Sequence, residues 1–190
     1  MPKVGMEPIR RDAIVRATIA ELGAARSLDV TVSQIAKRAG MSSALAHHYF
    51  GGKEQMFLAA MRRILSDFGA EVRGALSRAA PGDRARAILR ACFAPSCFSP
   101  DVIAAWMTFY VLAQTNDDAL RLWRIYQARI RSNLTHALRP QMADPARAAE
   151  LLVALIDGLY IHAALGAPEA PEVAVERAQR VLDTLIKAET

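Results

Sequence analysis

Cysteine is scarce in this chain of 190 residues, which contains only Cys92 and Cys97. Their five-residue offset fits no zinc-ligand pattern, and no pair of histidines stands near enough in the sequence to complete one. We therefore expect no metal site. We interpret both thiols as small buried hydrophobic groups of a protein in the reducing cytosol.

Long apolar runs are also missing. The most apolar stretch, residues 151–165, is interrupted by Asp157 and His162 and is too short to cross a bilayer. The first residues carry basic side chains with no apolar run behind them, which argues against a signal peptide. We therefore expect a cytoplasmic protein without a membrane partner.

Motifs of the common enzyme classes are absent from the sequence. It contains no G-x-S-x-G elbow, no phosphate-binding glycine loop, no H-E-x-x-H and no paired-carboxylate motif. We predict that the protein is not an enzyme and needs no cofactor. A helical enzyme stays a distant alternative.

Alternating patterns typical of strands are absent too. Alanine, leucine and arginine dominate, and glycine and proline fall where helices would end, so we predict an all-α fold of nine or ten helices. Asp83 is the expected N-cap of a helix that ends near residue 93. The expected helices span residues 8–22, two short segments within 31–50, then 53–79, 83–93, 101–115, a segment ending near 138, 145–166 and 172–187.

The charge that is present is unevenly distributed. The chain is 53% hydrophobic and carries a formal net charge of +5. Residues 1–63 hold 10 Lys and Arg against 5 Asp and Glu, whereas the remaining residues hold 14 of each kind. A basic N-terminal third on a neutral body is typical of phosphate-backbone binding, although a solvated basic surface would have the same composition.

Residues 31–50 carry the most informative pattern. Thr31 and Gln34 have the spacing of a capping box, and Gly40 is placed to end the first short helix in a left-handed conformation. Ser42 then caps a second helix after one turn residue. Two short helices joined in this way predict a helix-turn-helix that binds duplex DNA.

The second of these helices, about residues 42–48, is expected to lie in the major groove. Hydroxyl and imidazole groups can hydrogen-bond base edges, and a small alanine leaves room for a thymine methyl group. Adjacent helical residues point about 100° apart, so the tandem histidines are a poor metal site. The candidates for base contact are Ser43, Ala44 and His47, and the other predicted DNA-binding residues of this helix are Ser42 and His48.

The segment His48-Tyr49-Phe50-Gly51-Gly52-Lys53 resembles the end of the DNA-binding module in the TetR family of bacterial repressors. Gly51-Gly52 departs from the family, which more often has a bulkier polar pair there. The resemblance implies an N-terminal helix-turn-helix domain, residues 1–65, and a helical effector-binding and dimerisation domain, residues 66–190.

The resemblance also implies that Tyr49 and Lys53 bind DNA phosphates. Further candidates for the DNA backbone are Arg10, Arg11, Thr31, Ser33 and Lys37, with plain solvation an equal alternative for Ser33 and Lys37. Lys3 and Arg10 are candidates for a minor-groove arm. Since one module offers few base contacts, we expect a homodimer that reads a palindromic operator.

Apolar residues in the last two predicted helices are numerous enough to form either a dimer interface or additional core. The sequence leaves both alternatives open for each of them. The residues are Leu151, Leu152, Leu155, Leu159, Val181, Leu182 and Leu185.

Aromatic residues concentrate between positions 93 and 160, and a carboxylate, Asp157, stands inside an apolar run near the end of that segment. A buried carboxylate needs a cation, which could be Arg124, Arg129 or Arg131, or a ligand held by aromatic faces. We predict an aromatic cage for such a ligand. Its predicted residues are Trp106, Phe109, Tyr110, Trp123, Tyr126, Asp157 and Tyr160.

Within the TetR family, the opening residues, the HHYF segment, Ala104-Ala105-Trp106 and residues 155–159 are similar to the choline-responsive repressors of glycine betaine synthesis genes. This similarity implies choline as the inducer that releases the protein from its operator. Another quaternary amine, drug or polyamine is the alternative ligand. A helical adaptor for acidic proteins is the remaining alternative class.

Overall fold

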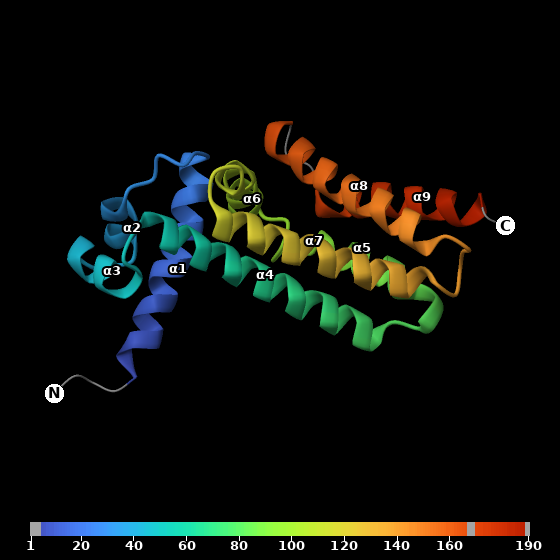
Figure 1. The fold of residues 1–190 in the computed structure, drawn as a ribbon, viewed down its shortest axis with the longest axis horizontal. Helices are drawn as coiled ribbons and strands as arrows, with labels where there is room; N and C mark the ends of the chain where they lie inside the picture. The colour runs from blue at the N-terminus through green and yellow to red at the C-terminus, as the bar shows by residue number, and fades with distance from the viewer. Residues whose placement is uncertain (1–4, 167–169, 189–190) are drawn as a thin grey trace. The chain divides into compact units, whose positions relative to one another are not determined.

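The computed structural model describes residues 5–166 and 170–188. Over these residues the chain forms nine α-helices and one short 3-10 helix, with no strand, which confirms the all-α prediction (Figure 1). The α-helices are α1 (Met6–Ala25), α2 (Val32–Arg38), α3 (Ser43–Phe50), α4 (Lys53–Arg78), α5 (Arg84–Cys92), α6 (Pro100–Ala113), α7 (Asp117–Leu138), α8 (Pro145–Leu165) and α9 (Pro171–Lys187), and the 3-10 helix is η1 (Pro81–Asp83).

Proline and short polar side chains begin several of these helices, as local sequence rules predict. Pro145 and Pro171 occupy the first turn of α8 and α9, where the missing N–H has no helical partner. The Asp144 carboxylate accepts the backbone N–H of Arg147 and so caps α8. Asp83 stands at the N-cap position of α5 as predicted, but it makes no side-chain capping bond, because its carboxylate pairs with Arg90 at 2.5 Å.

The chain divides into two compact units. Unit 1 contains the residues up to Ile64 together with Pro100–Leu120, and unit 2 contains Leu65–Ser99 and the residues from Arg121 onward. The break inside α4 lies next to the predicted boundary at residue 65. However, α6 groups with the N-terminal unit, whereas the sequence analysis placed it in the second domain. Both α4 and α7 run through the break as continuous helices.

The packing of α6 on α1 explains why α6 belongs to unit 1. The two helices meet so closely that a Cβ atom on Gly23 would lie 2.3 Å from Oδ1 and 2.8 Å from Cα of Asp101. Only glycine leaves room for this crossing. Further along α1, Ile14 and Leu22 are buried in the same core as Ile35 of α2.

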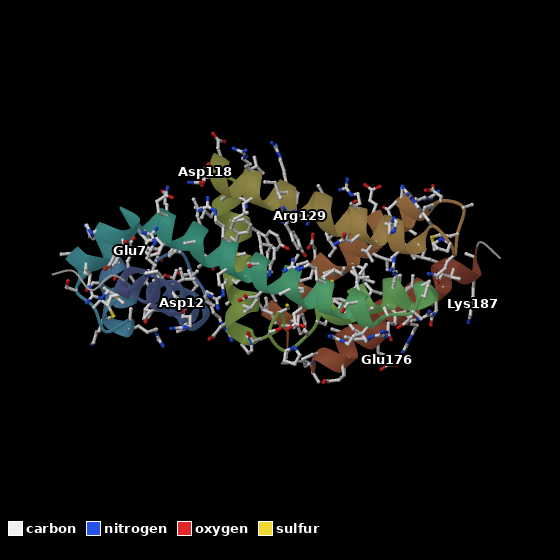
Figure 2. All side chains as sticks on the ribbon, turned by 90° about the horizontal axis from the view of Figure 1, so that it is seen from below. Glu7, Asp12, Asp118, Arg129, Glu176 and Lys187 are labelled. Atoms are coloured by element: carbon white, nitrogen blue, oxygen red, sulfur yellow. The ribbon has the colours of Figure 1, made fainter. Side chains whose placement is uncertain are left out.

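Unit 2 has a core of its own. In it, α9 packs against α5 and α8, and α8 and α9 run side by side (Figure 1). Ile88, Leu134 and Leu182 are fully buried, and Arg86 of α5 pairs with Asp183 of α9. The charged side chains of Glu176 and Lys187 extend outward from α9, as expected for its polar face (Figure 2).

The predicted dimer residues separate into two groups. Leu152, Leu159 and Leu182 are buried within the chain, so for them the interface alternative was wrong. The other four, Leu151, Leu155, Val181 and Leu185, are exposed or half-buried. They form an apolar strip on α8 and α9 that the chain itself leaves accessible.

Helix α8 is longer than residues 151–165, the apolar stretch that the sequence analysis judged too short to cross a bilayer. It extends from Pro145 and has 21 residues, which is long and apolar enough by length and composition to cross a membrane. A core helix passes the same test. Ala149, Leu152 and Ile156 of α8 are buried against the rest of unit 2.

Candidate DNA-binding and ligand sites

The turn between α2 and α3 is built by local hydrogen bonds. The Thr31 hydroxyl accepts the Gln34 N–H, and the Gln34 side chain accepts the Thr31 N–H at 2.8 Å, which completes the capping box. At the other end of α2, the N–H of Met41 donates to the carbonyl of Ala36, and Gly40 has φ +67°. This is a Schellman ending, and it turns the chain sharply into α3.

Helix α3 exposes the side chains that were predicted to read bases. The Ser42 hydroxyl caps the helix by accepting the Leu45 N–H. Ala46 is fully buried and anchors the inner face. Ala44 and His47 are exposed on the outer face, as a DNA-reading helix requires.

His47 is oriented by the end of its own helix. Its Nδ1 lies 3.1 Å from the carbonyl oxygen of Gly51, so Nδ1 carries the proton and Nε2 is left to face outward. The His48 ring instead contacts the Tyr49 ring edge-on at 5.4 Å. The described residues contain no cluster of three or more His, Cys, Asp or Glu suited to a metal.

Arg11 connects α1 to the end of α3. Its guanidinium donates to the Tyr49 carbonyl at 2.7 Å, lies 4.7 Å from the centre of the Phe50 ring and is 3.6 Å from Glu7. We therefore infer that Arg11 positions the recognition helix, and its contact with a DNA phosphate stays a prediction. Arg10, which is also on α1, donates to the Tyr49 hydroxyl at 3.4 Å and so orients the phenol ring.

The other predicted backbone contacts lie on or next to α2 and at the start of α4. Lys53 is exposed at the start of α4, and its ammonium donates to the Leu28 carbonyl at 3.1 Å. Ser33 and Lys37 are exposed on α2. The Thr31 hydroxyl is occupied by the capping box, and Lys3 lies outside the described residues.

The carboxylate predicted to hold a cation lies in unit 2. Asp157 is half-buried on α8, and its Oδ2 accepts the side-chain amide of Gln127, on α7, at 2.9 Å. Gln127 is itself 7% exposed. The partners expected for Asp157 were an arginine or a bound cation. Gln127 was not predicted; it stands one helical turn after Trp123 on the same face of α7.

Trp123 adds an unusual feature to that face. Among the described residues, its indole Nε1–H is a buried donor that has no hydrogen-bond partner. A buried N–H group without a partner is costly, and a ligand oxygen would remove that cost. The neighbouring Tyr126 ring packs edge-on against Phe68 at 5.6 Å.

Tyr160 has a structural role in unit 2. Its hydroxyl donates to the carbonyl of Cys92 at 2.7 Å and also lies 3.0 Å from that of Cys97, and its ring packs at 5.0 Å against Phe98. This anchors α8 to the segment that follows α5. Tyr160 is therefore part of the core of unit 2, and its place in the aromatic cage stays a prediction.

The two cysteines near Tyr160 are buried, as predicted. Burial raises the pKa of the Cys97 thiol to about 11 and that of Cys92 far above its ordinary range. Both thiols are therefore protonated at neutral pH, which makes them poor nucleophiles.

The aromatic residues of α6 form a cluster in unit 1. The Trp106 ring lies 5.9 Å from Phe109 and 5.7 Å from Tyr110. Trp106 and Phe109 are buried, whereas Tyr110 is half-buried. Helix α6 is the one that packs on α1, so this cluster and the helix-turn-helix share a unit.

Asn116 connects the start of α7 to the start of α4 within unit 1. Its side-chain oxygen accepts the Ala119 N–H at 3.0 Å and so caps α7. Its amide nitrogen donates to Glu54 at 3.1 Å, directly beside the predicted phosphate contact Lys53. The contact with Glu54 joins residues 62 positions apart, so no local sequence pattern predicts it.

A helix-turn-helix with its recognition helix exposed, joined to a separate helical unit, defines a DNA-binding regulator. Comparison with known families agrees. Residues 14–60 match the bacterial regulatory proteins of the tetR family, and residues 81–189 match the C-terminal region of the BetI-type transcriptional repressor. The chain belongs to the TetR family, and within it to the BetI-type repressors, so it is a transcriptional regulator and not an enzyme.

Curated relatives support this placement. The regulator BetI of Brucella suis biovar 1 is 52% identical over 178 residues, which cover 92% of this chain and 89% of that protein. BetI of Agrobacterium fabrum is 46% identical over 179 residues, which cover 90% and 87%. The family resemblance drawn from the sequence is therefore confirmed.

Solved structures share the fold. A TetR transcription regulator from Haloarcula marismortui has a TM-score of 0.83 at 21% identity, covering 93% of this chain and 98% of its own. A transcriptional regulator from Saccharomonospora viridis, solved in complex with choline, has a TM-score of 0.78 at 19% identity, covering 91% and 95%. TetR-family regulators bind DNA and small-molecule ligands and are dimers.

Proposed function

We propose that this repressor is released from its operator by choline and controls glycine betaine synthesis genes in the cytoplasm. The observation that carries the ligand proposal is the polar pair on the inner faces of α7 and α8. A half-buried carboxylate, Asp157, lies against a neutral amide, and a buried indole N–H without a partner stands one helical turn away. The BetI name of the relatives supports the same ligand.

Choline matches these groups because it carries one cationic end and one hydroxyl. A quaternary ammonium beside Asp157 offsets the cost of a carboxylate that is partly removed from water. Aromatic faces such as those of Trp123 and Tyr126 attract the same cation by about 1–2 kcal/mol per good contact. The choline hydroxyl is an acceptor for the Trp123 N–H. Glycine betaine would instead bring its own carboxylate towards Asp157 and bind less well.

On the DNA side, we propose that Ser43, Ala44 and His47 contact base edges while Tyr49 and Lys53 hold the phosphates. His47 presents Nε2 outward because Nδ1 is engaged by Gly51. In its neutral form this nitrogen accepts from an exocyclic amine of adenine or cytosine. A symmetric dimer that covers the apolar strip of Leu151 and Val181 would place two such helices on a palindrome.

Release follows from linkage between the two sites. An inducer shifts the equilibrium only by binding more tightly to a conformation that no longer fits the operator. Helix α7 carries Trp123 and Gln127, and its N-cap, Asn116, bonds to Glu54 at the start of α4. A small displacement of α7 is thereby passed to the helix that begins with Lys53.

The test is operator binding with and without choline for the wild type and for Asp157→Asn. The asparagine is nearly isosteric and keeps an acceptor for Gln127, but it removes the charge. We expect unchanged DNA affinity and a choline affinity at least about tenfold weaker, since a charged partner is lost. Glu150→Gln, an exposed site on α8, is the matched control. An Asp157→Asn variant that choline still releases normally would refute the assignment of the ligand site.

A further inference from the structure

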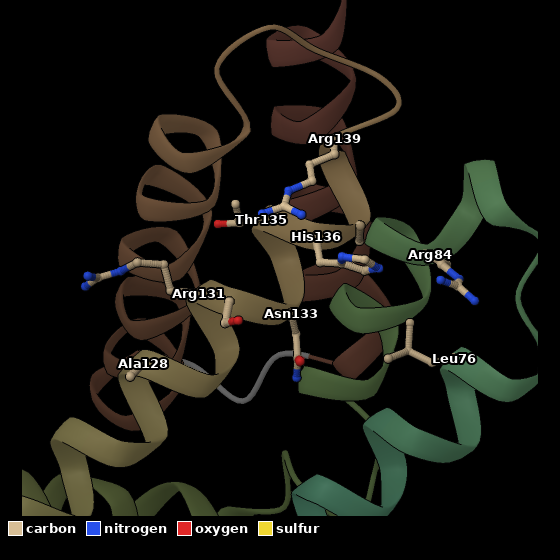
Figure 3. A pocket seen from close by; sticks show the side chains of 10 residues that line it. Leu76, Arg84, Ala128, Arg131, Asn133, Thr135, His136 and Arg139 are labelled. Atoms are coloured by element: carbon tan, nitrogen blue, oxygen red, sulfur yellow. The ribbon is translucent and has the colours of Figure 1, made fainter.

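Unit 2 contains a cavity that none of the proposed choline-binding residues lines. It has a volume of about 500 Å³ and opens between the C-terminal half of α7, the end of α4 and the start of α5 (Figure 3). Leu76 of α4 contributes an apolar wall. The remaining lining residues are Arg84, Ala128, Arg131, Ser132, Asn133, Thr135, His136, Ala137 and Arg139.

Every ionisable group that lines this cavity is basic. Arg84 comes from α5, His136 from the last turn of α7, and Arg139 directly follows α7, while Arg131 extends to the other side of α7 (Figure 3). No Asp or Glu is among the lining residues. In the rest of unit 2, by contrast, Arg86 pairs with Asp183.

Local structure increases this positive potential. Arg84 is the first residue of α5, at the positive end of the helix dipole. Asp83 stands at the cap position but makes no side-chain cap, because Arg90 engages its carboxylate. A cation at an uncapped helix start is unfavourable unless an anion is present.

We propose that this cavity binds a small polyanion that carries a phosphate group, such as a phosphorylated metabolite. Guanidinium groups present N–H donors in a planar fork that matches phosphate oxygens, and Asn133 and Thr135 add neutral polar groups. The volume suits a small molecule, because ligand pockets span about 300–1,000 Å³. The proposal is independent of the choline site and adds a second effector to the same unit.

The experiment uses the full-length protein and pyrophosphate as the probe, with choline absent. Thermal unfolding and titration calorimetry are measured for the wild type and for an Arg84→Gln, Arg139→Gln double variant. Arg147→Gln on α8 is the control, because Arg147 is exposed and does not line the cavity. We expect saturable binding that raises the melting temperature of the wild type and the control by a few degrees. The double variant should bind at least about tenfold more weakly, since two charged donors are lost.

Three outcomes would overturn the proposal. Pyrophosphate binding that is equal in the wild type and the double variant would mean that the ion binds elsewhere. The absence of saturable binding to a folded wild-type protein would mean that the surface is merely solvated. Loss of operator affinity in the double variant, without any added anion and without pyrophosphate binding in the wild type, would make these arginines a DNA contact. The circular dichroism spectrum verifies that both variants are folded.

Discussion

The helix-turn-helix and the α7–α8 region differ in how far apart in the sequence their contacts lie. The hydrogen bonds that shape the first join residues three to five positions apart, as between Thr31 and Gln34 or Met41 and Ala36. In the second, Gln127 and Asp157 are 30 positions apart, and Tyr160 and Cys92 are 68 positions apart. The candidate DNA-reading surface is therefore specified locally, whereas the proposed ligand site can form only after α7 and α8 have packed.

This difference has a thermodynamic consequence. Local capping bonds form together with the helices that they cap and contribute about 1 kcal/mol each. Long-range polar pairs depend on the whole core, so a change in packing alters their geometry. A site that depends on long-range packing can therefore have two arrangements. An inducer acts by binding one of the two more tightly than the other.

The largest effect on operator affinity is expected from a change on the exposed face of α3. Ala44→Glu would place a carboxylate against the phosphates and base edges. We expect operator affinity to fall by roughly 100-fold or more, because like charges in a polyanion complex are strongly unfavourable. Choline binding should be unchanged. Fluorescence anisotropy with labelled operator, together with calorimetry for choline, measures both.

The control for this change is Ala70→Glu, an exposed alanine on α4. It adds the same charge at a position outside the helix-turn-helix. If both variants lost operator binding equally, net charge and not the α3 surface would account for the effect.

How far the sequence predicts each region follows from the same distinction. The capping box, Gly40 and the exposed Ala44 were predicted because each depends on neighbours within one or two helical turns. The separation of Leu152 from Leu151, and the role of Gln127, were not, because they depend on which face of α8 and α7 meets the core. The pairing of Asp83 with Arg90 shows that a tertiary or medium-range partner can displace a local cap.

Gly23→Ala tests the contact between α1 and α6, which belongs neither to the helix-turn-helix nor to the α7–α8 region. The added Cβ would lie 2.8 Å from the Asp101 backbone, so α6 must move away from α1. We expect the free energy of unfolding to fall by about 1–3 kcal/mol, even though alanine favours a helix more than glycine does. Chemical denaturation measures the change. Gly82→Ala, where an added Cβ meets nothing within 4 Å, should leave stability within about 0.5 kcal/mol.

Arg11→Met tests whether a basic residue near the DNA-binding surface acts on DNA or on the protein. The assigned role is to hold the Tyr49 carbonyl, so operator affinity should drop by about fivefold, the equivalent of one lost hydrogen bond. The slope of log affinity against log salt should stay the same. Lys37→Met is the matched comparison, because loss of a true phosphate contact lowers that slope by about 0.9. If Arg11→Met also lowered the slope of log affinity against log salt, Arg11 would be a phosphate contact.

The smallest effect is expected at Asn116, where the local and long-range networks meet. Asn116→Asp keeps the oxygen that caps α7 but removes the donor to Glu54 and places two carboxylates side by side. The cap protects stability, so choline affinity should change little. The factor by which choline weakens operator binding should fall by about two- to threefold, because the start of α4 is no longer tied to α7. Asn116→Ala, which loses the cap as well, should lower stability by about 1 kcal/mol in addition. If both variants kept the full choline effect, the signal would travel through α4 itself and not through its contact with the α7 cap.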